Sequence, residues 1–289
     1  MASDHRRLNL SAGLASVGVA LFLAGLKLYA LMLTGSLSVA ASLADSAMDV
    51  LVSAAGLGAI LYAARPADED HSFGHSAVED IAALFQSVIV AGAGLLVGWA
   101  ALRRLAAAGE AASLASTGLG LAVMAVSAGA TLLLVWWQAH VARRTGSKVV
   151  AADRLHYIGD LGPTLGAMAA LLLASPRVDA VIALVAAGWM LWGARGIGAA
   201  AWDALMDREA DAATVAGIAA ILDHWPGLHG WHDLHTRTSG SRLFVHVHVE
   251  LDGDQPLREA HAIGAALKSE ILRAYPGAYV LVHKDVAGG

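Results

Sequence analysis

The chain has 289 residues, of which 57% are hydrophobic and 15% are charged, and its formal net charge is −5 at pH 7. Soluble domains have about 25% charged residues, so this composition excludes an ordinary soluble protein and indicates an integral membrane protein. The acidic balance argues against a nucleic-acid partner, and the lack of cysteine excludes disulfides and thiolate metal sites.

Six apolar runs are each long enough to cross a bilayer core of about 30 Å, which takes roughly 20 helical residues. We predict spans near residues 9–33, 37–63, 80–102, 114–139, 149–173 and 178–200. If the N-terminus is inside, the cytoplasmic side carries Arg6, Arg7, Arg65, Arg143, Arg144 and Lys148, and the other side carries Arg103, Arg104 and Arg177. This excess favours a membrane all-α six-helix bundle with both termini in the cytoplasm.

The apolar excess ends near Leu205, and the chain from Asp207 onward has the charge density of a soluble domain. We therefore predict a transmembrane domain at residues 1–206 and a second domain at residues 207–289. The second domain is predicted to be α+β, with a helix, two strands, a helix and a strand at residues 212–224, 232–238, 243–251, 256–275 and 279–285. It holds eight of the thirteen histidines.

Two pairs of ionisable residues lie inside predicted spans. Asp45 and Asp49 are on the second span, and His156 and Asp160 are on the fifth. Residues at i and i+4 share a helix face, so the four side chains can form one tetrahedral site for a divalent metal. A charge at mid-membrane costs at least about 2.5–3.5 kcal/mol, so helix capping or a simple interhelical hydrogen bond is the weaker interpretation of two such pairs.

This set of ligands also predicts how the site would work. Three carboxylates crowded in a low dielectric hold protons when the site is empty, because burial and like charge both disfavour ionisation. A divalent metal needs deprotonated ligands, so metal binding would expel protons. A site that faces each side of the membrane in turn would then exchange metal for protons. One imidazole and three carboxylates suit Zn²⁺ and tolerate Cd²⁺, Fe²⁺, Co²⁺ or Mn²⁺.

Two further metal sites are predicted outside the spans. One lies on the loop after the second span and consists of Asp68, His71 and His75; its alternative is a solvated polar loop. The other would draw on three strands and one helix of the second domain, with the ligands His232, His248, His261, His283 and Asp285. Its alternative is a set of scattered surface histidines, which is how we interpret His224, His229, His235 and His246.

The sequence resembles the cation diffusion facilitator family over nearly its whole length. The resemblance rests on Asp45/Asp49, on His156/Asp160, on His71-Ser72-Phe73-Gly74-His75, and on Trp225-Pro226-Gly227 and His232-Asp233-Leu234. Within the family, the chain resembles in particular the bacterial zinc/proton antiporters that are also called ferrous-iron efflux pumps.

The resemblance implies a homodimer in the bacterial inner membrane that exports Zn²⁺ or a similar ion in exchange for protons. It implies a transport site at Asp45, Asp49, His156 and Asp160, and a loop site at Asp68, His71 and His75. The second domain is similar to a metallochaperone-like cytoplasmic domain that dimerises around a structural two-metal site. The resemblance places His232, His248, His261, His283 and Asp285 at that site, with Asp285 as the bridging ligand.

One position departs from the family pattern. Close relatives carry a lysine where this chain has Ala77, and the resemblance implies that the lysine pairs with an aspartate matching Asp207 at the dimer hinge. In this chain Asp207 is present and that lysine is not.

Other classes of function fit the sequence less well. An intramembrane metal hydrolase needs an open water position beside a general base, and the chain has no His-Glu-x-x-His stretch. A membrane metal sensor without transport would need an output domain. We therefore expect a transporter and not an enzyme.

Overall fold

A computed structural model describes residues 2–34, 37–106, 118–173 and 176–288 of the chain. Side chains are described for most of these residues, but the side chain of Asp45 lies outside the described part. The chain divides into two compact units, one spanning His5–Trp202 and the other formed mainly by the residues from Asp203 onward.

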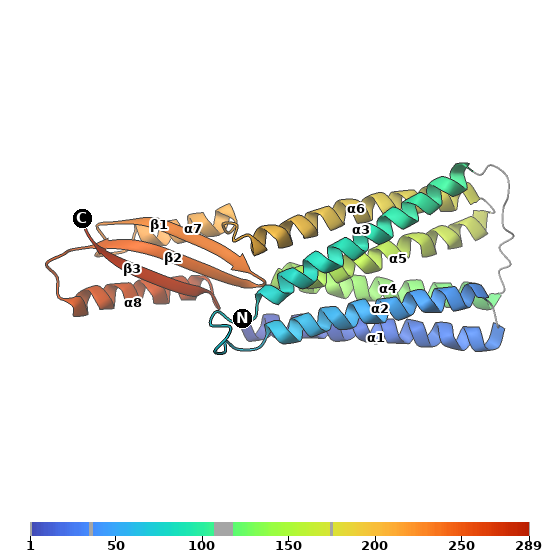
Figure 1. Ribbon diagram of the computed structural model, residues 1–289, viewed down its shortest axis with the longest axis horizontal. Helices are drawn as coiled ribbons and strands as arrows, with labels where there is room; N and C mark the ends of the chain where they lie inside the picture. The colour runs from blue at the N-terminus through green and yellow to red at the C-terminus, as the bar shows by residue number, and fades with distance from the viewer. Residues whose placement is uncertain (1, 35–36, 107–117, 174–175, 289) are drawn as a thin grey trace. The chain divides into compact units, whose positions relative to one another are not determined.

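Long helices make up the first unit and lie alongside one another (Figure 1). In the described residues they are α1 (Ala2–Thr34), α2 (Leu37–Ala63), α3 (Ala77–Ala106), α4 (Gly118–Thr145), α5 (Lys148–Leu173) and α6 (Pro176–Leu205). Each predicted span falls on one of these helices, although residues 114–117 of the fourth lie outside the described residues. Helix α5 packs against α2, α3 and α4, so its side chains meet those of three neighbours.

The helical unit has an apolar surface and buries polar side chains among apolar ones. Large apolar side chains such as Leu96, Leu133 and Trp192 are about 70% exposed, at 71%, 71% and 69%. Ser16 and Gln138 are fully buried. A water-soluble bundle would bury most of its large apolar side chains, so this unit is built to lie in lipid.

Three helices of the described chain are long and apolar enough to cross a membrane. They lie within Asp4–Ala30, Ala77–Arg103 and Ala122–Thr145. On α2, which spans Leu37–Ala63, the apolar segment found in the described residues is Asp49–Ala63, and α5 carries charged residues including Asp153, Arg154 and Asp160. The count of six spans stays a prediction.

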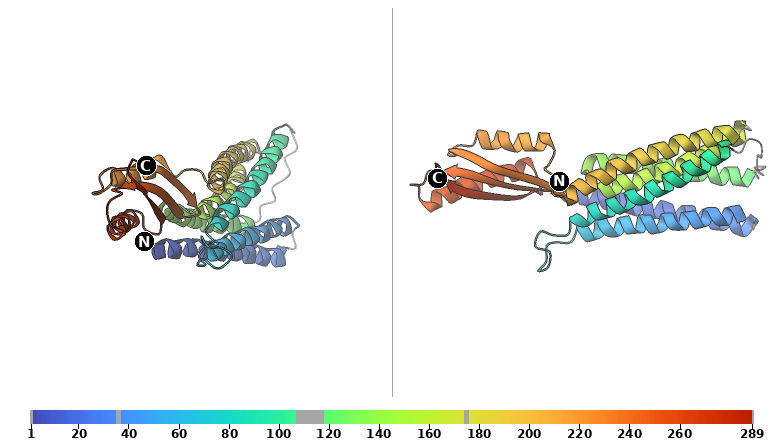
Figure 2. Two further views of the ribbon diagram at one scale, coloured as in Figure 1. Left: turned by 60° about the vertical axis from the view of Figure 1, so that its left-hand side comes forward. Right: turned by 45° about the horizontal axis from the view of Figure 1, so that its top comes forward.

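The second unit has the element order that the sequence predicted. Its elements are α7 (Ala212–Asp223), β1 (Gly230–Ser239), β2 (Arg242–Leu251), α8 (Leu257–Ala274) and β3 (Tyr279–Val286). The strands form one sheet in the order β1-β2-β3, as labelled in Figure 1, and Figure 2 shows the sheet in two further views. β1 and β2 form an antiparallel hairpin, and β3 pairs parallel to β2 after the crossover through α8.

Both short helices cover the same face of this sheet. Val245, Val247 and Val249 of β2 form the core together with Leu222 of α7 and Leu267 of α8, among others. Successive side chains of a strand point to opposite faces, so the intervening side chains of β2, including His246 and His248, lie on the face that neither helix covers. We call this the open face of the sheet.

The core contact of α8 gives a first prediction. Leu267 is fully buried, whereas Leu257 on the same helix is 83% exposed. We expect Leu267→Ala to lower the free energy of unfolding of the second unit by about 2–5 kcal/mol, because a cavity is left in a packed core. Amide hydrogen exchange in β2 would measure the loss. Leu257→Ala, with the same chemical change at an exposed position, should leave the exchange unchanged, and equal effects would contradict this account of the core.

Helix α7 begins at a carboxylate cap. Asp211 accepts hydrogen bonds from the backbone N–H groups of Ala213 (3.1 Å) and Thr214 (3.0 Å) and from the Thr214 hydroxyl (2.6 Å). The hydroxyl bond, and then the backbone bonds, lower the pKa of Asp211 below its ordinary value. The ionised cap therefore stabilises the helix above about pH 4, and this contribution is lost as the pH falls through the lowered pKa.

We expect Asp211→Ala to lower the urea midpoint of the second unit at pH 7, because α7 loses its cap. The gap between wild type and Asp211→Ala should narrow as the pH falls below about 4, following the sign of the pKa shift. Asp211→Asn, which can still cap the helix, is the matched control and should stay near wild type at pH 7. A gap of the same size at pH 7 and pH 3 would contradict the role given to the ionised carboxylate.

Candidate metal centres

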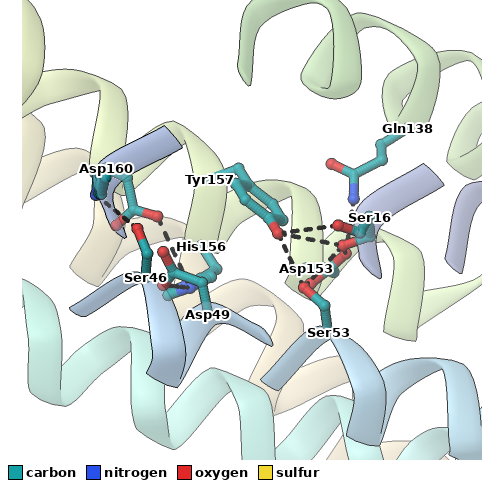
Figure 3. Close-up of polar contacts among 10 residues, drawn as sticks. Ser16, Ser46, Asp49, Ser53, Gln138, Asp153, His156, Tyr157 and Asp160 are labelled. Carbon is teal, nitrogen blue, oxygen red and sulfur yellow. Dashed lines mark hydrogen bonds and ion pairs between the residues drawn. The ribbon is translucent and has the colours of Figure 1, made fainter. Parts of the chain in front are cut away.

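The first cluster lies where α2 and α5 meet inside the helical unit. His156 Nε2 is 3.0 Å from Asp49 Oδ1 and 3.8 Å from Asp160 Oδ2. Figure 3 shows Asp49 and Asp160 grouped around His156. Asp49 and His156 are each 8% exposed, so the cluster is shielded from the surface. Asp45, the fourth predicted ligand, is on α2 one turn before Asp49, and its side chain lies outside the described part of the chain.

The distances between these ligand atoms are compatible with either a shared proton or a bound metal ion. Ligands about 2 Å from one tetrahedral zinc lie roughly 3.3 Å apart. The two measured separations, 3.0 and 3.8 Å, lie on either side of this value. The shorter one is also a hydrogen-bond length, so the same pair of atoms can share a proton when no metal is bound. The donor set therefore fits a divalent cation without a large rearrangement.

A second polar network lies beside this cluster (Figure 3). Asp153 Oδ2 accepts hydrogen bonds from the Ser16 hydroxyl (2.6 Å) and from Gln138 Nε2 (2.7 Å). The hydroxyl of Tyr157 lies 2.9 Å from that of Ser53, which Ser16 contacts at 2.8 Å. The network thus connects α1, α2, α4 and α5 one helical turn from His156.

This network was not predicted from the sequence, although Asp153 carries a signal that could have indicated it. Asp153 lies inside the fifth predicted span, three residues before His156 and seven before Asp160, so it falls on a similar face of the helix. The serines, the glutamine and the tyrosine carry no such signal, because uncharged polar residues are common in membrane helices.

Lys27 of α1, to which the sequence analysis gave no role, also reaches into the polar interior. Its Nζ donates a hydrogen bond to the hydroxyl of Ser46 at 2.6 Å. Ser46 is fully buried on α2, three residues before Asp49. The ammonium group is therefore held beside α2 close to the level of the first cluster.

The second cluster lies on the loop between α2 and α3. Asp68 Oδ1 is 3.0 Å from His71 Nδ1, and Asp68 Oδ2 is 3.1 Å from His75 Nε2. The backbone N–H of His71 also donates to Asp68 Oδ1 at 2.7 Å. The structure therefore brings together all three predicted loop ligands, with Asp68 between the two imidazoles.

The loop cluster combines one buried ligand with two exposed ones. The His75 side chain is 3% exposed and packs edge-on against the Tyr62 ring, with 4.8 Å between the centroids. The Asp68 and His71 side chains are about half exposed. The hydrogen bond from His71, followed by the charges of the two histidines, lowers the pKa of Asp68. An ionised carboxylate between two imidazoles at the surface suits a cation that enters from solvent.

The third cluster lies on the open face of the sheet. His232, His248 and His283 stand opposite one another in the strand register, so they form a row across β1, β2 and β3. Asp285 Oδ2 is 2.8 Å from His248 Nδ1 and 3.4 Å from His232 Nε2, whereas its Oδ1 is 3.2 Å from His283 Nε2. One oxygen of the Asp285 carboxylate thus lies near His248 and His232, and the other lies near His283.

The pKa of Asp285 is lowered, first by its hydrogen bond with His248 and then by the charges of His283, His248 and His232. The predicted ligand His261 is exposed near the start of α8, and α8 packs on the sheet face opposite to His248. Within the described residues of this single chain, His261 does not join the cluster, and its assignment stays a prediction.

Asp207, whose lysine partner is missing at Ala77, has a partner of its own within the second unit. Arg237 Nη1 donates to Asp207 Oδ1 at 2.9 Å. The Arg237 guanidinium also lies 4.3 Å from the centre of the Phe244 ring. Arg237 of β1 therefore balances the charge of Asp207, for which the sequence alone indicated no partner.

The fold and the clusters define a class: a membrane protein with carboxylates and an imidazole grouped in its interior, and a second domain that carries its own histidine cluster. Residues 13–206 match the cation efflux transmembrane domain, and residues 210–286 match the cytoplasmic domain of cation efflux proteins. The chain belongs to the cation efflux family, also called the cation diffusion facilitators. It is a transporter that exports divalent cations, and not an enzyme.

Curated relatives match over almost the whole chain. The cation-efflux pump FieF of Serratia proteamaculans is 37% identical over 288 residues, covering 99% of this chain and 95% of that protein. The FieF pump of Pectobacterium carotovorum has the same identity and coverage, 37%, 99% and 95%. A solved structure, the metal-bound C-terminal domain of the CzcD transporter from Thermotoga maritima, is 24% identical, covers 27% of this chain and 91% of that chain, and has a TM-score of 0.26.

Proposed function

We propose that this protein is a homodimeric antiporter that exports Zn²⁺ from the cytoplasm in exchange for protons across the bacterial inner membrane. The observation that carries the proposal is the buried group of Asp49, His156 and Asp160, whose ligand atoms all lie within 4.8 Å of one another. Fe²⁺, Cd²⁺, Co²⁺ and Mn²⁺ accept the same nitrogen and oxygen ligands and are the alternative substrates.

The transport site is proposed to consist of Asp45, Asp49, His156 and Asp160. A buried imidazole beside two or three carboxylates exchanges one divalent ion for protons at nearly constant charge, which keeps the cost of crossing the low dielectric small. The 3.0 Å contact between His156 and Asp49 is where a proton would be held before metal arrives. Proton coupling then follows from the ligands themselves.

The two other clusters are proposed to bind metal without transporting it. Asp68, His71 and His75 would hold an ion on the loop between α2 and α3. The domain of residues 207–289 would lie in the cytoplasm and dimerise, with Asp285 bridging two metal ions held by His232, His248, His283 and His261. The use of both Asp285 oxygens supports the bridging role. Six spans, α1 to α6, and two cytoplasmic termini complete the proposed topology.

Proteoliposomes test the proposal directly. Purified protein is reconstituted with a zinc-sensitive dye inside, and a pH gradient of one unit is imposed in either direction. We expect zinc to enter when protons can leave, and its flux to change severalfold with the sign of the gradient. Competition with Fe²⁺, Cd²⁺, Co²⁺ and Mn²⁺ ranks the substrates. Flux that is indifferent to the gradient would exclude antiport.

A further inference from the structure

The second unit contains a pocket beside the third cluster on the open face of the sheet. We call it the linker pocket, because it lies between the segment that follows α6 and the sheet. It is lined by Asp207, Glu209, His235, Thr236, Arg237, Phe244 and His246. Two imidazoles and two carboxylates therefore border one opening in a chain whose family function is to handle metal ions.

His235 and His246 are brought together by the register of the sheet. They stand directly opposite each other on β1 and β2. Opposed residues of an antiparallel pair have Cβ atoms about 5 Å apart, which is close enough for two imidazoles to share one ion. The pair lies on the open face, because its cross-strand neighbours Thr236 and Val245 are buried toward the core.

An irregularity in β1 is the cause of this placement. The register shifts between His232 and His235, and Asp233 in between has a φ of 49°. In a regular strand, residues three apart point to opposite faces. The bulge adds one residue, so both histidines point to the open face. If β1 were a regular strand, the alternation of its side chains would place His232 and His235 on opposite faces of the sheet.

Glu209 supplies a carboxylate from a segment that is attached to β1. The backbone N–H of Ala210 donates to Thr236 Oγ1 at 3.2 Å, and Arg237 holds Asp207 at 2.9 Å. These two contacts attach the chain on either side of Glu209 to the residues that follow His235. The Asp207 charge is balanced by Arg237, so Glu209 is the carboxylate left to serve a cation.

We propose that His235, His246 and Glu209 form a further site for a divalent metal of the zinc class, separate from the cluster around Asp285. Two imidazoles, one carboxylate and a water molecule are a common tetrahedral set for zinc. Among the described residues, these ligand atoms do not converge as closely as in the other three clusters, so binding requires rotation of the exposed His235 and Glu209 side chains. A bound ion would join the segment after α6 to β1 and β2.

Counting bound zinc tests this site without reference to transport. Full-length protein in detergent is saturated with Zn²⁺, separated from free metal, and analysed for zinc per protomer. We expect His235→Ala and His246→Ala each to bind one zinc fewer than wild type. His229→Ala, which removes an exposed histidine outside the linker pocket, is the matched control and should bind the wild-type number. Glu209→Gln should weaken the same site about tenfold.

The double variant His246→Ala/His248→Ala separates this site from its neighbour, because it should lose more zinc than His248→Ala alone. An unchanged zinc count in either His235→Ala or His246→Ala would overturn the proposal. So would a double variant that loses no more than His248→Ala, since both histidines would then belong to one site. If an alanine variant melts below wild type, the glutamine variants His235→Gln and His246→Gln replace it in the same count.

Discussion

His156→Ala is expected to reduce zinc flux in proteoliposomes by about 100-fold or more. The imidazole is the only nitrogen ligand of the proposed transport site, and its Nε2 contacts both Asp49 and Asp160. Even changes in groups that only support a ligand cost about 10–100-fold in metal affinity, so loss of the ligand itself should cost at least as much. The carboxylates left behind would prefer harder cations, so the remaining flux should shift from zinc toward manganese.

The matched control for this experiment is His140→Ala, also in the helical unit. His140 stacks on Trp137 of the same helix, with 5.7 Å between the ring centroids, and is not part of the cluster. It should keep nearly all of the zinc flux. His248→Ala, in the third cluster, should weaken dimerisation of the second unit and leave residual flux. Equal losses from His156→Ala and His248→Ala would mean that the roles of the two clusters are assigned wrongly.

Asp153→Ala is expected to destabilise the helical unit by about 1–3 kcal/mol, the cost of one unsatisfied buried donor. The substitution removes the acceptor for the fully buried Gln138 amide, whereas the Ser16 hydroxyl keeps Ser53 as a partner. Because the network joins four helices one turn from His156, we also expect weaker zinc binding at the transport site. Unfolding in detergent with increasing denaturant, and zinc titration at fixed pH, would measure the two effects.

Asp153→Asn is the matched control, because both hydrogen bonds end on one oxygen of Asp153, an amide carbonyl oxygen can accept both, and the volume is unchanged. It should lose less than half of the stability that Asp153→Ala loses. If both variants unfold like wild type, the network does not stabilise the packing of α1, α2 and α4 around α5, and its structural role is refuted.

The sequence analysis placed the helices well because lipid imposes a simple rule. A run of about 20 apolar residues must be helical in a bilayer, so each predicted range overlaps one of the helices α1 to α6 in the described residues. The same rule made ionisable residues in these runs conspicuous, which is why Asp49, His156 and Asp160 were found. Asp153 was overlooked because it has no i+4 partner among the carboxylates and histidines, and its partners Ser16 and Gln138 come from two other helices.

In the second unit, alternation along β2 separated the valine core from the histidine face, and turn residues marked the ends of each element. The sequence alone therefore determined the element order, the apolar and polar faces, and the ligand types. Which histidines meet was decided by the tertiary structure. The strand register aligns His232, His248 and His283, and the bulge at Asp233 turns His235 toward His246. Register and bulges depend on pairing between distant segments, so local sequence patterns determine which residues can bind metal, and only the folded sheet decides which of them share an ion.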